Sequence, residues 1–211
     1  MRATKAAANR RRMVAAALGR FSADGWAGTT MASIAEEAGV AVQTLYYTFH
    51  TKGALLEEAI GAAILGIDGW EEPPREPDTA ELVNLHGWWA PFADATTATE
   101  ALDLFVEAGV PILARVAPLL SAMRSTVGDA EAEAVVRVAE ERRADSYREA
   151  VHVLAGKPHG LRGGLDEAAA TDVLLALFSA EVYATLAARG WTADRCLDFF
   201  RDLLQERLLR D

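Results

Sequence analysis

The side chains best suited to molecular recognition lie close together, within residues 29–56 of the 211-residue chain. Gln43 carries an amide that can pair with N6 and N7 of adenine in the major groove of DNA. Val42 and the methyl group of Thr44 flank it and suit contact with thymine methyl groups. This combination predicts the reading of base edges.

Neighbouring side chains suit phosphate oxygens, which position a protein on DNA without reading its sequence. Tyrosine and threonine hydroxyls and a lysine ammonium supply the hydrogen-bond donors. Thr48 is expected to face outward with them. The predicted DNA-contacting residues are Thr30, Val42, Gln43, Thr44, Tyr46, Tyr47, Thr48 and Lys52.

Short helices must position these side chains. A first helix is predicted over about residues 5–22, with a stop at Asp24-Gly25. Thr30 has the hydroxyl of an N-cap for a helix over about residues 31–38, which Gly39 ends, and another helix follows over about residues 41–49. Thr51 is a second predicted N-cap and begins a fourth helix. Two short helices joined by a glycine-containing turn indicate a helix-turn-helix.

Apolar residues in the same stretch predict which faces are buried. Ile34, Ala35 and Ala38 are expected to pack inward on the first helix of the motif, with a small residue at 35 allowing close approach. Val40 is expected to fill the space under the turn. Leu45 and Phe49, four residues apart, are expected to anchor the second helix on the core.

The pattern resembles the tetracycline-repressor (TetR) family of transcriptional regulators. About a dozen positions match that family's signature in order and spacing. They are Phe21, Gly25, Thr30, Ile34-Ala35, Ala38-Gly39-Val40, Thr44-Leu45-Tyr46, Phe49, Lys52 and Leu55. Two positions depart from it. Ala41 replaces the usual serine N-cap of the recognition helix, a change that costs about 1 kcal/mol, and Gly53 replaces the usual glutamate at the start of the fourth helix.

The charge distribution agrees with a polyanion-binding N-terminus. The whole chain has a net charge of -10, but residues 1–52 contain seven Lys/Arg and three Asp/Glu, or +4, which leaves -14 on the remainder. Such an asymmetry suggests one basic face. Arg10, Arg11 and Arg12 either form an arm that reaches a DNA groove or lie on a solvated helix face.

Apolar residues in the rest of the chain recur at helical spacing, which predicts an all-α fold. Residues 1–52 are predicted to form the DNA-binding domain, and residues 53–211 a helical ligand-binding and dimerisation domain. The helices are expected at about residues 79–89, 97–109, 111–124, 129–155, 166–189 and 192–210, with loops at 71–78 and 156–164.

The last two helices resemble those through which TetR-family proteins dimerise as a four-helix bundle. Their apolar stripes independently predict faces in need of cover. The predicted interface residues are Leu174, Phe178, Val182, Leu197, Phe200 and Leu204.

The middle helices are rich in aromatic residues with scattered polar groups, as small-molecule pockets often are. The candidate ligand-binding residues are His86, Trp88, Trp89, Phe105, Arg115, Arg124 and Tyr147. An alternative interpretation is that none of them contacts a ligand. Aromatic side chains are more often part of a core, and single polar residues are more often exposed or paired.

The sequence disfavours several other classes. His50, His86, His152, His159 and Cys196 lack metal-ligand spacing, and neither a phosphate-binding glycine loop nor a nucleophile elbow is present. We therefore expect no metal, no cofactor and no enzymatic activity. No export signal or membrane span is expected, and the single cysteine fits a cytoplasmic setting.

The resemblance thus implies a homodimeric regulator, most simply a repressor, that binds a palindromic DNA operator and is released by a small hydrophobic effector. The alternative is a helical ligand-binding module without operator-specific regulation.

Overall fold

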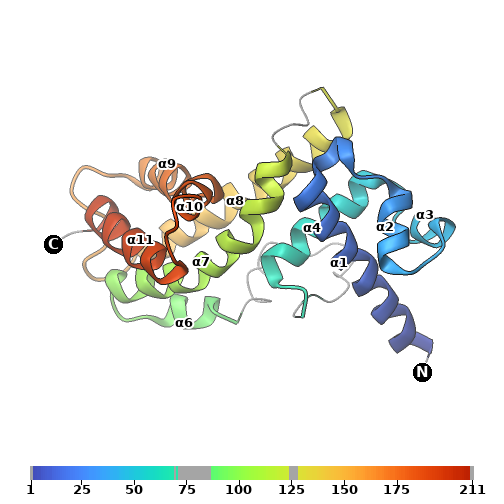
Figure 1. Cartoon of the computed structure of the whole chain (residues 1–211). Helices are drawn as coiled ribbons and strands as arrows, with labels where there is room; N and C mark the ends of the chain where they lie inside the picture. Colours follow the sequence, from blue (N-terminus) through green and yellow to red (C-terminus); the bar gives the residue numbers. More distant parts are fainter. Residues whose placement is uncertain (1, 69, 71–86, 124–127, 210–211) are drawn as a thin grey trace. The chain divides into compact units, whose positions relative to one another are not determined.

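The computed structural model describes residues 2–68, 70, 87–123 and 128–209, and its regular elements there are helices (Figure 1). Extended pairing in this part of the chain is limited to an isolated bridge between Leu161 and Leu209. The predicted all-α class is confirmed. The chain divides into two compact units. The boundary expected at residue 52, between a DNA-binding and a ligand-binding domain, stays a prediction. Unit 1 comprises Met1–Glu76 and Arg115–Glu140, and unit 2 comprises Pro77–Ala114 and Glu141–Asp211.

Unit 1 contains α1 (Arg2–Gly28), α2 (Met31–Ala38), α3 (Val42–Phe49) and α4 (Lys52–Leu65). The predicted break in the first helix is confirmed, because Gly25 leaves the helical region with φ 68° and ψ -174°. This conformation suits glycine, which has no Cβ to clash. The helices share one buried core to which Phe21, Leu45 and Leu55 contribute.

Local caps set the boundaries of α2 and the start of α4. The Thr30 hydroxyl accepts the Ser33 N–H, and Ser33 bonds back to the Thr30 backbone, which completes a capping box. Gly39 ends α2 in the left-handed conformation with φ 65°. Thr51 caps α4 by accepting the Ala54 N–H. The predicted N-caps and the glycine stop are confirmed.

The middle of the chain differs from the prediction. The helix expected at 79–89 and the loop expected at 71–78 lie largely outside the described residues, and α6 spans Trp89–Asp94. The two helices expected at 97–109 and 111–124 are one, α7 (Ala98–Met123), which continues through Pro111. A proline removes one backbone hydrogen bond. The buried face nevertheless continues across it, with Val106, Val110 and Leu113 all nearly inaccessible.

The predicted long helix is confirmed as α8 (Ala130–Ala155). The helix expected at 166–189 is instead two helices, α9 (Glu167–Leu177) and α10 (Ala180–Ala187). The chain turns at Phe178, whose ring is buried, and the Ser179 hydroxyl accepts the Val182 N–H to start α10. The last helix, α11, spans Ala193–Leu208.

Within the described part of the chain, two helical stretches, Ala98–Met123 and Glu167–Ala187, are long and apolar enough to cross a membrane by length and composition alone. The second is interrupted at Phe178 and Ser179. Core helices of soluble proteins meet the same criterion, so length and composition do not distinguish a membrane-spanning helix from a buried core helix.

Candidate nucleic-acid interface

The recognition helix α3 is held by the apolar contacts predicted for it. Ile34, Ala35 and Ala38 of α2 are buried, as are Leu45 and Phe49 of α3. The turn between the helices is closed by the Val40 N–H, which donates to the Ala35 carbonyl over 3.0 Å, and Val40 packs against the same core. The helix-turn-helix therefore presents a fixed outer face of α3.

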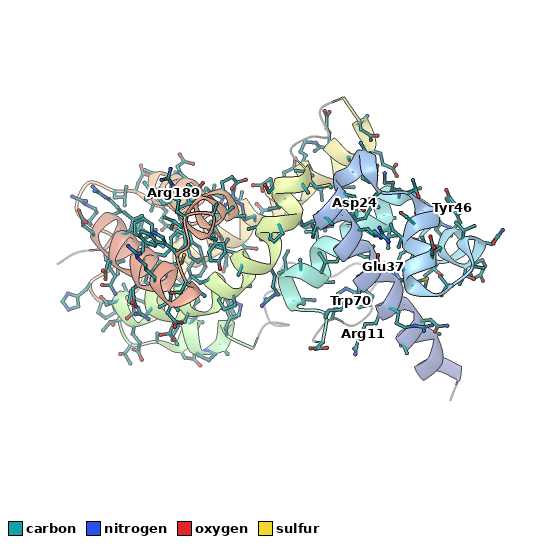
Figure 2. The ribbon with its side chains drawn as sticks, in the orientation of Figure 1. Arg11, Asp24, Glu37, Tyr46, Trp70 and Arg189 are labelled. Atoms are coloured by element: carbon teal, nitrogen blue, oxygen red, sulfur yellow. The ribbon has the colours of Figure 1, made fainter. Side chains whose placement is uncertain are left out.

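That outer face carries most of the predicted contact residues. Gln43 and Thr44 are exposed, whereas Val42 and Thr48 are half-buried. Tyr46 is 50% exposed and Tyr47 is 85% exposed, and they are the exposed large hydrophobic side chains among the described residues (Tyr46 in Figure 2). An amide and two phenols displayed together can donate and accept hydrogen bonds without any rearrangement of the core.

Hydroxyl groups on this surface also have internal partners. The Thr48 hydroxyl donates to the Thr44 carbonyl over 2.8 Å, and the Thr30 hydroxyl belongs to the capping box of α2. At the start of α3, the N-cap residue Ala41 makes no side-chain cap hydrogen bond.

Lys52 lies against the end of α1. Its ammonium donates to the Trp26 carbonyl and sits 4.1 Å from the centre of the Trp26 ring. Burial lowers the pKa of Lys52, against an opposing effect of Asp129 and Glu131. The Trp26 side chain donates to Asp129, and this bond is the main cause of the lowered pKa of Asp129. Lys52 thus has a structural role that the motif alone did not predict.

The basic residues of α1 are largely engaged within unit 1. Arg10 pairs with Glu58 and lies over the Phe49 ring at 4.8 Å. Arg11 donates to the Trp70 carbonyl over 3.2 Å (Figure 2). Arg12 is exposed and donates to the Asn9 side chain. This arrangement favours the solvated helix face over a groove-reaching arm.

Unit 2 gathers part of the predicted effector site into one aromatic cluster. Its rings contact one another with neighbouring centroids 5.0–6.3 Å apart. These rings include Trp88, Trp89, Phe92, Phe105, Tyr147, Phe178 and Phe200. The Tyr147 hydroxyl donates to the Phe178 carbonyl over 2.8 Å.

Of the charged candidates for the effector site, Arg115 is described and is not in this cluster. Arg115 belongs to unit 1, where it bonds the carbonyls of Ala63 and Ile64. His86 and Arg124 lie outside the described residues. Among the residues that are described, no group of three or more His, Cys, Asp or Glu side chains is placed to hold a metal ion.

The predicted dimer residues fall into two groups. Leu174, Phe178, Phe200 and Leu204 are at most 1% exposed within the single chain. Val182 and Leu197 are half-buried, as are Leu186 and Leu203 on the same helices. The apolar periodicity therefore identified buried positions of α9 and α11 together with half-buried positions on α10 and α11.

Comparison with known proteins agrees with this architecture. Residues 13–59, which cover most of the helix-turn-helix unit, match the family model described as bacterial regulatory proteins, tetR family. No curated protein matches the chain.

Similar solved structures extend the likeness to both units. NalD, a secondary repressor of the MexAB-OprM multidrug efflux pump in Pseudomonas aeruginosa, has a TM-score of 0.68 at 17% identity, over 96% of each chain. FadR from Bacillus subtilis, solved with stearoyl-CoA, has a TM-score of 0.66 at 16% identity, over 92% of this chain and 96% of that one. A regulator from Saccharomonospora viridis, solved with choline, has a TM-score of 0.67 at 18% identity, over 96% and 98%. These likenesses establish the fold, and the match over residues 13–59 identifies the N-terminal helices as a tetR-family DNA-binding unit.

Proposed function

We propose that this chain is a TetR-family repressor that binds a palindromic DNA operator as a homodimer and leaves it when a small molecule binds. The observation that carries the proposal is the exposed face of α3, where Gln43, Thr44, Tyr46 and Tyr47 project from a helix anchored on a buried core. A helix-turn-helix inserts the N-terminal part of such a helix into the major groove.

The residues of α3 have separate roles in this proposal. Gln43 pairs with adenine, while Val42 and Thr44 contact thymine methyl groups. Tyr46 and Tyr47 are exposed and lie further along the helix, where their hydroxyls can bond phosphate oxygens. The exposed N-terminus of α2 at Thr30 adds a further phosphate contact. In this proposal Lys52 supports the DNA-binding unit by donating a hydrogen bond to the Trp26 carbonyl at the end of α1.

Dimerisation is proposed through the half-buried apolar side chains of α10 and α11, including Val182 and Leu197. A two-fold dimer presents two copies of α3 to two half-sites about one turn of DNA apart. Leu197→Glu should dissociate the dimer, because an unpaired charge buried in an interface costs several kcal/mol. Sedimentation at micromolar concentration tests this, and a wild-type protein that sediments as a monomer would contradict it.

The effector is proposed to bind near the aromatic cluster of unit 2. Neighbours with this fold were solved with stearoyl-CoA and with choline. An aromatic environment with few polar groups suits a moderately hydrophobic compound. Trp88 and Trp89 are half-buried and in ring contact at 5.6 Å. A ligand beside them should change their fluorescence, and replacing each with Phe separates this signal from those of the other tryptophans.

Release requires that the effector prefer the conformation that does not fit the operator. A complete switch needs a preference of about 5.5 kcal/mol. By linkage, operator DNA must weaken effector binding by the same factor. A compound that releases the operator yet binds free and DNA-bound protein equally would contradict this mechanism.

The primary test is selection from a pool of random DNA duplexes by the full-length protein. Enrichment of a sequence with two-fold symmetry is the expected result. If no duplex is enriched while small molecules still bind, the chain is instead a helical ligand-binding module without operator-specific regulation.

A further inference from the structure

Both ends of α4 are bonded by charged side chains that are distant in sequence but belong to unit 1. At its C-terminal end, Arg115 of α7 donates to the Ala63 carbonyl over 2.8 Å and to the Ile64 carbonyl over 2.7 Å. At its N-terminal end, a carboxylate oxygen of Glu131 of α8 accepts the Gly53 N–H over 2.9 Å. A cation at the C-terminus and an anion at the N-terminus both complement the helix dipole.

The glycine at position 53 makes the second contact possible. A Cβ atom there would lie 2.7 Å from both Cγ and Oε1 of Glu131, so the Glu131 side chain would have to move away. Glycine within a helix is less stable than alanine, and at position 53 its missing side chain leaves room for the Glu131 carboxylate. The departure from the family signature at Gly53 is thus accompanied by a carboxylate supplied from α8.

Asp129, the residue before α8, also bonds the end of α1. Asp129 accepts a hydrogen bond from the Trp26 side chain, and the Lys52 ammonium lies over the same ring. Lys52 is the first residue of α4. The start of α8, the end of α1 and the start of α4 are therefore joined by hydrogen bonds and charge.

α4 in turn supports the recognition helix. Leu55 and Leu56 of α4 are fully buried in the same core cluster as Leu45 and Phe49 of α3. A displacement of α4 would disturb this packing, because protein cores are close-packed and transmit strain.

We propose that Arg115 and Glu131 form a clamp on the two ends of α4 and act as positioning residues for DNA recognition by α3. The inference rests on the proposed DNA-binding function, and it adds the residues that hold the reading surface in place. α7 and α8 each continue as unbroken helices to Phe105 and Tyr147 of the aromatic cluster. The helices that bear the clamp are therefore also the helices that supply rings to the proposed effector site.

The test compares clamp variants of the full-length protein by amide hydrogen exchange and by DNA binding. In Glu131→Ala, Arg115→Ala and Gly53→Ala, amides of α3 and α4 should exchange about tenfold faster, since local opening becomes easier. Affinity for the duplex selected by wild-type protein should fall by about tenfold, without a change in the slope of log affinity against log salt, because no phosphate contact is lost.

Matched variants separate positioning from general destabilisation. Glu131→Gln keeps a hydrogen-bond acceptor and Arg115→Lys keeps a cation, so each should recover part of the lost affinity. Glu149→Gln removes a charge from an exposed position on the same helix as Glu131 and should change neither measurement. Gly53→Ala combined with Glu131→Ala should be no worse than the more severe single variant, because both break one contact.

The clamp is overturned if all three variants stay within about twofold of wild type in α3 and α4 exchange. It is also overturned if they flatten the salt slope, which would mean that these residues contact phosphate directly. Failure of the wild-type protein to select any duplex refutes the proposed DNA function instead. The exchange measurement on free protein still decides whether the clamp holds α4.

Discussion

The two units place their aromatic side chains in opposite ways. In unit 1, Tyr46 and Tyr47 stand on the surface of α3, at 50% and 85% exposure. In unit 2, Phe92, Phe178 and Phe200 are at most 1% exposed and contact further rings. The difference teaches that similar residue types serve distinct purposes, since exposed phenols suit a polar partner and buried rings suit core packing beside an apolar ligand.

The comparison is tested most severely by removing one ring from the aromatic cluster. Phe178→Ala should lower the free energy of unfolding by about 3–5 kcal/mol, because it leaves a cavity among buried rings. Chemical denaturation measures this loss. Tyr47→Ala is the matched control and should stay within about 0.5 kcal/mol of wild type, as exposed positions usually do. Equal losses at the two positions would remove the distinction between the units.

Gln43 tests whether the exposed side of the comparison reads DNA. Gln43→Ala should lose about 1–3 kcal/mol of binding free energy on the selected duplex. It should lose less on duplexes in which the contacted base pair is changed, because the discriminating bond is gone. Titration of both duplexes measures the difference, and a uniform loss on every sequence would assign Gln43 to phosphate instead.

Tyr147 tests the polar contact within the cluster. Tyr147→Phe removes the hydrogen bond to the Phe178 carbonyl but retains the ring. The expected loss of unfolding free energy is about 1 kcal/mol, typical of a single hydrogen bond. Urea unfolding of the variant alongside wild type measures it, and an unchanged midpoint would show that the bond contributes nothing to stability.

The smallest effect is a pH dependence at the start of α8. The folded-state pKa of Asp129 is lowered, chiefly by the hydrogen bond from Trp26. A depressed carboxyl pKa contributes stability that is present above the unfolded-state value and is lost as the pH falls through the folded-state value. Asp129→Asn should therefore be less stable than wild type near neutral pH, and the gap should close in acid. A gap that is constant from pH 7 to strong acid would contradict this assignment.

Local chemistry made unit 1 predictable from sequence. Thr30 caps α2 and Gly39 ends it through bonds to residues within a few positions, so spacing alone located both ends. Contacts distant in sequence were not predictable in this way. Nothing near Gly53 indicates that a carboxylate 78 residues away would bond its N–H, and the motif suggested a phosphate contact for Lys52 before its place over Trp26 was known.

Unit 2 was predicted less completely because its helix ends depend on tertiary packing. Two helices were predicted, over residues 97–109 and 111–124, but the buried face of α7 continues past residue 110. Phe178 and Ser179 gave little indication of the turn between α9 and α10, which accompanies burial of the Phe178 ring. Periodicity correctly identified Leu174 and Phe200 as apolar-face residues, but it could not distinguish a core within one chain from an interface between two.

The most direct test of the account is to repeat the duplex selection with the recognition-helix variant Gln43→Ala/Thr44→Ala. Both side chains are exposed, so the variant should fold and dimerise as wild type does. The account predicts that wild-type protein enriches a two-fold symmetric sequence and that the variant loses this preference at the contacted base pairs. Enrichment of the same sequence by the variant, or of no symmetric sequence by wild type, would contradict the claim that α3 reads an operator.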